Sequence, residues 1–388
     1  MSRSLKVEVE PQVFKWLRTS SGWSVEDVSK CLKTSVEVVE AIEQGQWQPT
    51  PTQLKKLSEA YKRPLATFLL SEPLDEPPLP KDYRLLPGKK NVFDKKTMYA
   101  IRKARNLQEI GGELLKNINE DIKPKTKQVT ISENPDELAQ YYREKFALDI
   151  DIQKKFKNSH AFYNHLRDIF EDANILVFQF SMPINDARGF VLADQIPHII
   201  VVNSKDSIEA RIFTLLHEFA HILLGETVID LPNILIPKQN KIEYWCNQFA
   251  SSFLLPKQIA QTLFTTQKET LTSTDTLNSL SRKYKVSKAM LLYNMLKQGF
   301  INQDEFEETL ERYKPLEAEV ITKDTPKKTE KKGGGIPQDR RCLTEVGNKF
   351  ISIVASNYDR NYITYTDALN FLSVKSNNFD KVLAKAKK

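Results

Sequence analysis

The stretch SIEARIFTLLHEFAHILLGE, residues 207–226, constrains the fold of this chain more than any other segment. Asp206 is a predicted N-cap with Glu209 three residues later, and Gly225 is a predicted stop, so a helix is expected over about 207–224. Large apolar side chains give this helix a core-packing face: Leu215, Leu216, Phe219, Ile222 and Leu223. The segment therefore belongs to the interior of a globular domain.

Two histidines and a glutamate on this helix form a motif with its own chemistry. His217 and His221 are one helical turn apart, and Glu218 lies about 100° round the helix from His217. Two imidazoles at this spacing can hold one zinc ion, while the intervening glutamate can act as general base. The alternative, two buried histidines with structural hydrogen bonds, is disfavoured because the core face is already complete. A metal site is predicted.

A catalytic zinc site also needs a third protein ligand. The next suitable segment is KIEYWCNQFASSFLLP, residues 241–256, which predicts a second buried helix that ends at Pro256. Glu243, at its start and 22 residues beyond His221, is the predicted third ligand. Its alternative is a solvated glutamate that complements the helix dipole. Asn247, one turn later, is predicted to hold the Glu243 carboxylate or a ligand imidazole in place by a hydrogen bond. The alternative is a structural cap.

Composition excludes several other classes of protein. The net charge of +7 comes entirely from the C-terminal region, because residues from Lys323 onward hold 14 basic and 7 acidic side chains. A general argument from charge to DNA binding therefore fails. The three cysteines lie far apart, which excludes a disulfide framework and a thiolate zinc cluster and predicts a reducing, cytoplasmic location. No apolar run reaches the roughly 18 residues of a membrane span, so neither export nor a membrane partner is expected.

Three sequence blocks together resemble a known family. PHIIVVN, RIFTLLHEFAHILLG and EYWCNQFASSFLLP look like the zinc metallopeptidase domain of the ImmA/IrrE family (DUF955), over about residues 160–300. The resemblance implies that His217, His221 and Glu243 are the zinc ligands and that Glu218 is the catalytic base. It also implies a protein substrate, since family members cut repressors in stress responses and mobile elements.

Two positions depart from the family pattern. Ala220 replaces the usual glycine between the histidines, and Cys246 replaces the usual alanine before Asn247. Both side chains are small and leave the predicted chemistry intact. Cys246 is close in sequence to Glu243, so a role in perturbing the metal or in sensing oxidation is an alternative to a small core residue.

The first 70 residues predict four or five short helices and resemble an Xre-type helix–turn–helix domain. In that family the third helix, here SVEVVEAIEQGQWQPT, lies in the major groove of DNA. However, this segment carries Glu37, Glu40 and Glu43 and no basic residue over 35–45. The candidates for DNA contact are Lys30, Lys33, Gln44, Gln46 and Gln48. The alternative is a helix–turn–helix fold that binds protein or forms a homodimer.

The predicted fold is multidomain and mainly α. An Xre-like domain (1–72) and a Pro-rich linker (73–95) precede an ImmA/IrrE-like metallopeptidase domain (96–315). That domain is expected to be α+β and zincin-like, with a small three-stranded sheet formed by NILVFQF, GFVLA and HIIVVN. A charged, Gly-rich linker (316–338) then leads to a small helical C-terminal domain (339–388).

The leading functional hypothesis is a zinc-dependent endopeptidase that cuts a regulatory protein, such as a repressor or an antitoxin-like regulator. The N-terminal module would bind DNA or direct the enzyme to its target. The alternative is a transcription regulator or toxin–antitoxin component whose zinc domain is a sensor or a vestigial peptidase. Glu218 favours catalysis, because a sensor needs the ligands but not the base. A third hypothesis is a DNA-binding scaffold whose basic tail, LAKAKK, contacts phosphates.

Overall fold

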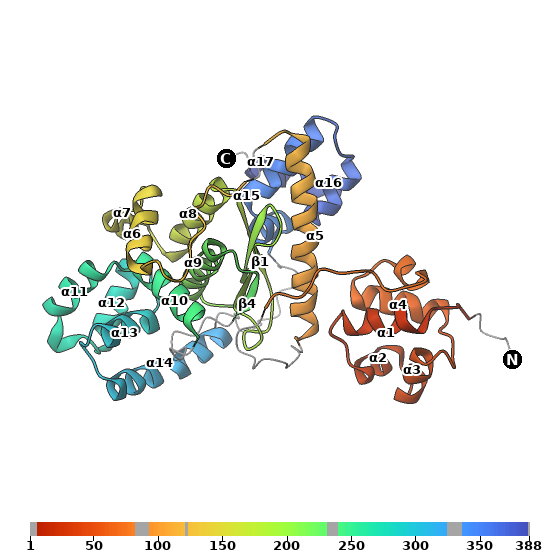
Figure 1. Ribbon diagram of the computed structural model, residues 1–388, viewed down its shortest axis with the longest axis horizontal. Helices are drawn as coiled ribbons and strands as arrows, with labels where there is room; N and C mark the ends of the chain where they lie inside the picture. The colour runs from red at the N-terminus through yellow and green to blue at the C-terminus, as the bar shows by residue number, and fades with distance from the viewer. Residues whose placement is uncertain (1–5, 82–92, 121–122, 231–239, 324–335, 387–388) are drawn as a thin grey trace. The chain divides into compact units, whose positions relative to one another are not determined.

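The computed structural model describes residues 6–81, 93–120, 123–230, 240–323 and 336–386, and side chains after residue 313 in the fourth range are not described (Figure 1). The described chain is mainly helical, with one small sheet. It divides into two compact units. One comprises residues 1–79, 85–105 and 181–186, and the other comprises residues 80–84, 106–180 and 187–388. None of the described helices is long and apolar enough to cross a membrane.

The N-terminal unit contains the short helices that the sequence predicts: α1 (Pro11–Thr19), α2 (Val25–Leu32), α3 (Val36–Glu43), α4 (Pro51–Tyr61) and the 3-10 turn η1 (Leu65–Leu69). Ser24 and Thr50 begin α2 and α4 with capping boxes, as their side chains accept the amide of the third helical residue. Buried Phe14, Leu57 and Phe68 belong to the core that joins these helices. The identification of this unit as a DNA-binding helix–turn–helix domain stays a prediction.

Apart from residues 80–84, the second unit starts at Asn106 within α5 (Lys95–Asn117), and its chain is helical before and after the sheet. Before the sheet come α6 (Pro135–Lys145), α7 (Ile150–Lys155) and α8 (Ser159–Asp172). Within and after it come α9 (Ile208–Leu224), α10 (Lys241–Leu254), α11 (Lys257–Thr266), η2 (Lys268–Thr270), α12 (Thr274–Tyr284), α13 (Lys288–Lys297), α14 (Gln303–Lys323), α15 (Gln338–Asp359), α16 (Tyr365–Leu372) and α17 (Ser376–Ala386). The predicted domain boundaries stay predictions, and residues 82–92 and 324–335 of the two predicted linkers lie outside the described residues.

The three predicted strands are confirmed as β1 (Ile175–Phe180), β2 (Gly189–Leu192) and β3 (His198–Asn203). A short fourth strand, β4 (Val228–Asp230), was not predicted, so the expectation of three strands is corrected to four. The order is β1-β3-β2-β4, with β1 parallel to β3 and both other pairings antiparallel. With only three residues, β4 was too short to show an alternating pattern in the sequence.

Helices cover both faces of the sheet, which explains why its strands are apolar at successive positions. Along β1, Ile175 and Val177 belong to the core shared with α8 and α9. Phe178 points to the other face, where its ring lies 5.7 Å from that of Phe350 on α15. Alternate residues of one strand therefore join the core beneath α9 to the layer that includes α15.

Candidate metal centre

Helix α9 carries the predicted histidine pair and is positioned by signals at both ends. It begins one residue later than predicted, because the N-cap is Ser207 rather than Asp206: the Ser207 hydroxyl accepts the Ala210 amide at 3.3 Å. Gly225 ends the helix in the left-handed conformation, as predicted. The helix is buried from Ile212 to Leu223, which encloses His217, Glu218 and His221 completely.

Helix α10 supplies the carboxylate. Asn240 caps its N-terminus by accepting the Glu243 amide at 3.3 Å, which places Glu243 in the first turn. The helix packs along α9 and alongside α6, and Phe249 and Phe253 are buried in the shared core. Glu243 is thereby only 2% exposed, so the alternative of a solvated glutamate is wrong, and its role as a metal ligand stays a prediction.

The three predicted ligands converge. Nε2 of His217 lies 3.1 Å from Nε2 of His221, and the two Glu243 carboxylate oxygens lie 3.2 Å and 3.3 Å from these nitrogens. Among the described residues, they are the only group of three or more His, Cys, Asp or Glu side chains close enough to share a metal ion.

These distances fit a tetrahedral metal ion. Bonds of 2.0 to 2.1 Å at tetrahedral angles separate ligand atoms by about 3.3 Å. The two nitrogens are separated by a similar distance, and so is each nitrogen from its nearer Glu243 oxygen. Two imidazole nitrogens and one carboxylate oxygen are also the donor set of open zinc sites in hydrolases. The donor chemistry and the spacing of the cluster therefore suit a metal ion with one coordination position left for water or substrate.

The electrostatics of the cluster favour the ligating form of histidine. Burial lowers the pKa of His221 below its ordinary value of 6.5, and Glu243 only partly opposes this effect. A neutral imidazole has a lone pair available for a metal, whereas a protonated one does not. A buried carboxylate beside two neutral rings has no permanent cation in the cluster, and a divalent ion would supply that charge.

Glu218, the predicted base, lies against strand β2 at Gly189. A Cβ atom added to Gly189 would lie 2.8 Å from the Glu218 carboxylate, 2.5 Å from Thr214 and 3.0 Å from the carbonyl oxygen of Val201. Only glycine leaves room for the carboxylate at this point of the strand. Sequence reasoning missed Gly189, although a glycine beginning the short apolar run GFVLA signals close backbone approach.

Two further residues of α10 lie near the ligands in sequence. The Cys246 thiol is 3.6 Å from Nδ1 of His221 and fully buried, so Cys246 contacts a ligand ring on the side away from the cluster. The sequence indicated only that Cys246 is close to Glu243, and it did not indicate the contact with His221. Asn247 is also buried, at 2% exposure, and its predicted part in holding a ligand stays a prediction.

The other histidines are not members of the cluster. His198 begins β3, where its Nδ1 lies 3.1 Å from the Gln195 carbonyl oxygen, and burial lowers its pKa. The ring of His165 packs 5.0 Å from that of Phe156 on the surface of α8. His160 is exposed.

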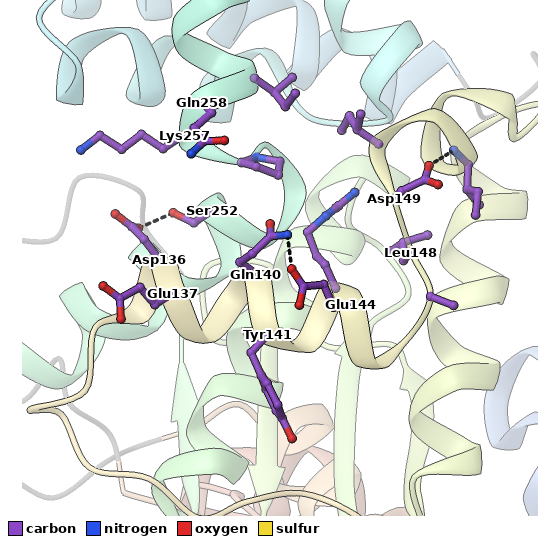
Figure 2. Close-up of a pocket in the computed structure, with 16 residues that line it drawn as sticks. Asp136, Glu137, Gln140, Tyr141, Glu144, Leu148, Asp149, Ser252, Lys257 and Gln258 are labelled. Atoms are coloured by element: carbon purple, nitrogen blue, oxygen red, sulfur yellow. Dashed lines mark hydrogen bonds between the residues drawn. The ribbon is translucent and has the colours of Figure 1, made fainter.

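An open groove lies elsewhere in this unit, between α6 and the start of α11 (Figure 2). Figure 2 shows Asp136 and Glu144 of α6 on one side and Lys257 and Gln258 on the other. Ser252 donates a hydrogen bond to Asp136 within it. None of the three cluster residues lines the groove, so the groove and the candidate metal site are separate.

Comparison with known proteins supports the same segment. Residues 170–296 match the family described as IrrE N-terminal-like domain, Peptidase_M78. This range contains β1 to β4, α9, α10 and all three cluster residues. No curated protein sequence matches the chain. The chain thus contains, at residues 170–296, an IrrE N-terminal-like domain of the M78 metallopeptidase family with a buried His217, His221 and Glu243 metal site.

Proposed function

We propose that this chain is a zinc-dependent endopeptidase that cuts a regulatory protein, such as a transcriptional repressor or an antitoxin-like regulator. The observation that carries the proposal is the convergence of His217, His221 and Glu243 in a domain that matches the M78 family, with Glu218 next to His217 on α9. The ImmA/IrrE resemblance supports a repressor as the substrate. The N-terminal unit would act as the targeting or DNA-binding module.

The roles of the residues follow from their chemistry. His217, His221 and Glu243 would hold the zinc ion, which when bound would polarise the scissile carbonyl and lower the pKa of a water molecule. Glu218 would accept a proton from the attacking water on a carboxylate oxygen and donate it to the leaving amine nitrogen. Helices α9 and α10 exclude solvent from the ligand side, because all four side chains are at most 2% exposed.

The first test is the metal content of the purified full chain. Elemental analysis should find about one zinc per chain in the wild type, almost none in Glu243→Ala, and the wild-type amount in Glu218→Gln. No zinc in wild-type protein from metal-replete cells would contradict the proposal.

Substrate cleavage needs a second experiment. Cells that express the wild type or Glu218→Gln would be compared for new protein N-termini, since both proteins keep the metal and differ only in the base. New termini within one regulatory protein, present only with the wild type, would identify the substrate. Identical sets of termini would favour the alternative, in which the zinc domain is a sensor or a vestigial peptidase.

A further inference from the structure

The C-terminal helix pair α16–α17 repeats the N-terminal pair α2–α3 at a constant spacing of 340 residues (Figure 1). Both first helices have eight residues, and both begin with a capping box in which the third helical residue is an aspartate, Asp27 or Asp367. Both end at a residue in the left-handed conformation, Lys33 or Ser373. Each second helix starts three residues after that turn residue.

The buried positions of the two pairs also coincide. The matched buried residues are Val28 and Ala368, Leu32 and Leu372, Val39 and Phe379, and Ile42 and Val382. The same faces of both second helices are therefore turned inward, and the opposite faces are turned outward. A helix, a three-residue turn and a second helix is the arrangement that lays the second helix in the major groove of DNA.

The two helix pairs carry opposite net charges. Residues 24–48 contain five acidic and two basic side chains, whereas residues 364–388 contain two acidic and five basic ones. Most of the affinity of a protein for duplex DNA comes from neutralising phosphates with lysine and arginine. On this measure the C-terminal pair suits DNA and the N-terminal pair does not.

The exposed face of each second helix sharpens the difference. Helix α3 exposes Glu37 and Glu40. At its N-terminal end α17 exposes Ser376, Asn377 and Lys381. Asparagine can bond both edge atoms of adenine, lysine bonds guanine, and serine bonds several bases, so α17 carries side chains that read a major groove.

The entry to α16 adds groups that suit the DNA backbone. Arg360, Tyr362 and Thr364 are exposed just before this helix, and Tyr362 is 53% exposed. In helix–turn–helix proteins the first helix crosses the phosphate backbone while the second enters the groove. Asp380, exposed on α17, and Asp359, exposed next to Arg360, are acidic side chains that oppose this role.

We propose that α16–α17 is a duplex-DNA-binding element, with α17 entering the major groove and Ser376, Asn377 and Lys381 facing base edges. The element contacts phosphates through Lys375 and the segment before α16. This site is independent of the metal centre and of the N-terminal unit, where DNA binding was predicted from sequence.

The test is fluorescence anisotropy of the full chain with a labelled 30-base-pair DNA duplex of mixed sequence, over a series of salt concentrations. The wild type should bind, with affinity falling steeply as salt rises. Lys375→Ala/Lys381→Ala should weaken binding and reduce the slope of log affinity against log salt by about 0.9, because Lys375 is the phosphate contact and each lost phosphate contact removes roughly that amount. The matched control Lys268→Ala/Lys283→Ala removes two exposed lysines of the second unit that lie outside α16–α17 and should leave the slope unchanged.

Asp380→Asn should strengthen binding severalfold, since it removes an opposing charge without adding a contact. An RNA duplex of the same sequence should compete poorly, because the major groove of A-form RNA is too narrow for a helix. The proposal is overturned if the wild type does not bind DNA at low salt, or if both lysine pairs weaken binding equally. Equal competition by the RNA duplex would also overturn it.

Discussion

Two of the buried carboxylates in the second unit, Glu171 and Glu243, have neighbours of different charge. Glu171 on α8 is 3% exposed and lies 2.9 Å from Nε of Arg167, while its other oxygen accepts the Lys349 amide. Glu243 is 2% exposed and faces two imidazoles. Arginine is a permanent cation, and neutral imidazole is not. A buried acid in an ion pair with arginine is structural, whereas one that faces two metal-binding imidazoles suits a metal.

The structural pair also shapes the helix packed on it. Helix α15 is interrupted at Gly347, where φ is +79° and ψ is 168°, a conformation that only glycine adopts readily. The Arg167 guanidinium donates to the carbonyl oxygens of Leu343 and Thr344, which precede the break. A Cβ on Gly347 would collide with the Glu171 carboxylate. The ion pair therefore satisfies backbone groups that the interrupted helix leaves unpaired.

The largest expected effect is on stability at the structural pair. Arg167→Ala leaves Glu171 and the two carbonyl oxygens buried without their donor, so we expect a loss of about 3 to 5 kcal/mol of unfolding free energy. Urea unfolding followed by circular dichroism would measure it. Arg167→Met/Glu171→Leu, which removes both charges, should be much less destabilising. An Arg167→Ala protein as stable as the wild type would show that the ion pair does not stabilise the fold.

Metal dependence is expected only at the other carboxylate. Zinc at a hundredfold excess over its dissociation constant should stabilise the wild type by about 2.7 kcal/mol, and a chelator should remove this gain. Glu243→Ala should show no zinc-dependent shift in thermal unfolding. Arg167→Ala should unfold at a lower temperature than the wild type but show the same zinc-dependent shift. Loss of that shift in Arg167→Ala would contradict the separation of the two sites.

Gly189→Ala tests how Glu218 is positioned. The added methyl group collides with the Glu218 carboxylate and the Val201 carbonyl, so we expect cleavage to fall about a hundredfold while zinc content stays the same. The rate would be measured on the substrate found by comparing new N-termini. Gly111→Ala is the control, because its methyl group approaches the end of the Leu176 side chain at 3.2 Å and makes ordinary contacts with Pro197 at 3.6 Å and Phe350 at 3.7 Å. Zinc loss in Gly189→Ala would show that the glycine supports the ligands instead.

Cys246→Ala should have a smaller effect, on metal affinity. The thiol contacts Nδ1 of His221, and groups that orient a ligand ring typically contribute tenfold or more to affinity. We expect a decrease of about tenfold, measured by competition with a zinc indicator. Cys31→Ala, a cysteine of the N-terminal unit, should leave affinity unchanged. Equal affinities for the wild type and Cys246→Ala would make the cysteine a small core residue only.

Acid should affect the metal-free cluster gradually. The folded-state pKa of His221 is lowered below 6.5, so the unfolded chain binds this proton first and stability falls as pH falls below about 6.5. The slope from one such group cannot exceed about 1.4 kcal/mol per pH unit. Unfolding of the chelated protein between pH 7 and 5 would measure the slope, and His221→Phe should reduce it. An unchanged slope would assign the acid sensitivity to other groups.

Local signals in the sequence were enough to predict the helices of the metal centre and the residues on them. Helix caps, the i, i+4 histidine spacing and the apolar run around Glu243 are interactions between near neighbours, which the order of residues determines directly. The three longer strands were predictable for the same reason. Strand β4 was not, because a three-residue strand exists only through its pairing with β2.

Contacts between elements that are distant in sequence followed from tertiary packing and could not be predicted from local patterns. The convergence of Glu243 with the histidines, the contact of Glu218 with Gly189, and the thiol beside His221 all depend on how α9, α10 and β2 pack. The interruption of α15 over Arg167 and Glu171 depends on contacts across some 180 residues. Such contacts form because buried charges and backbone groups must find partners, and no local pattern records which partner each one finds.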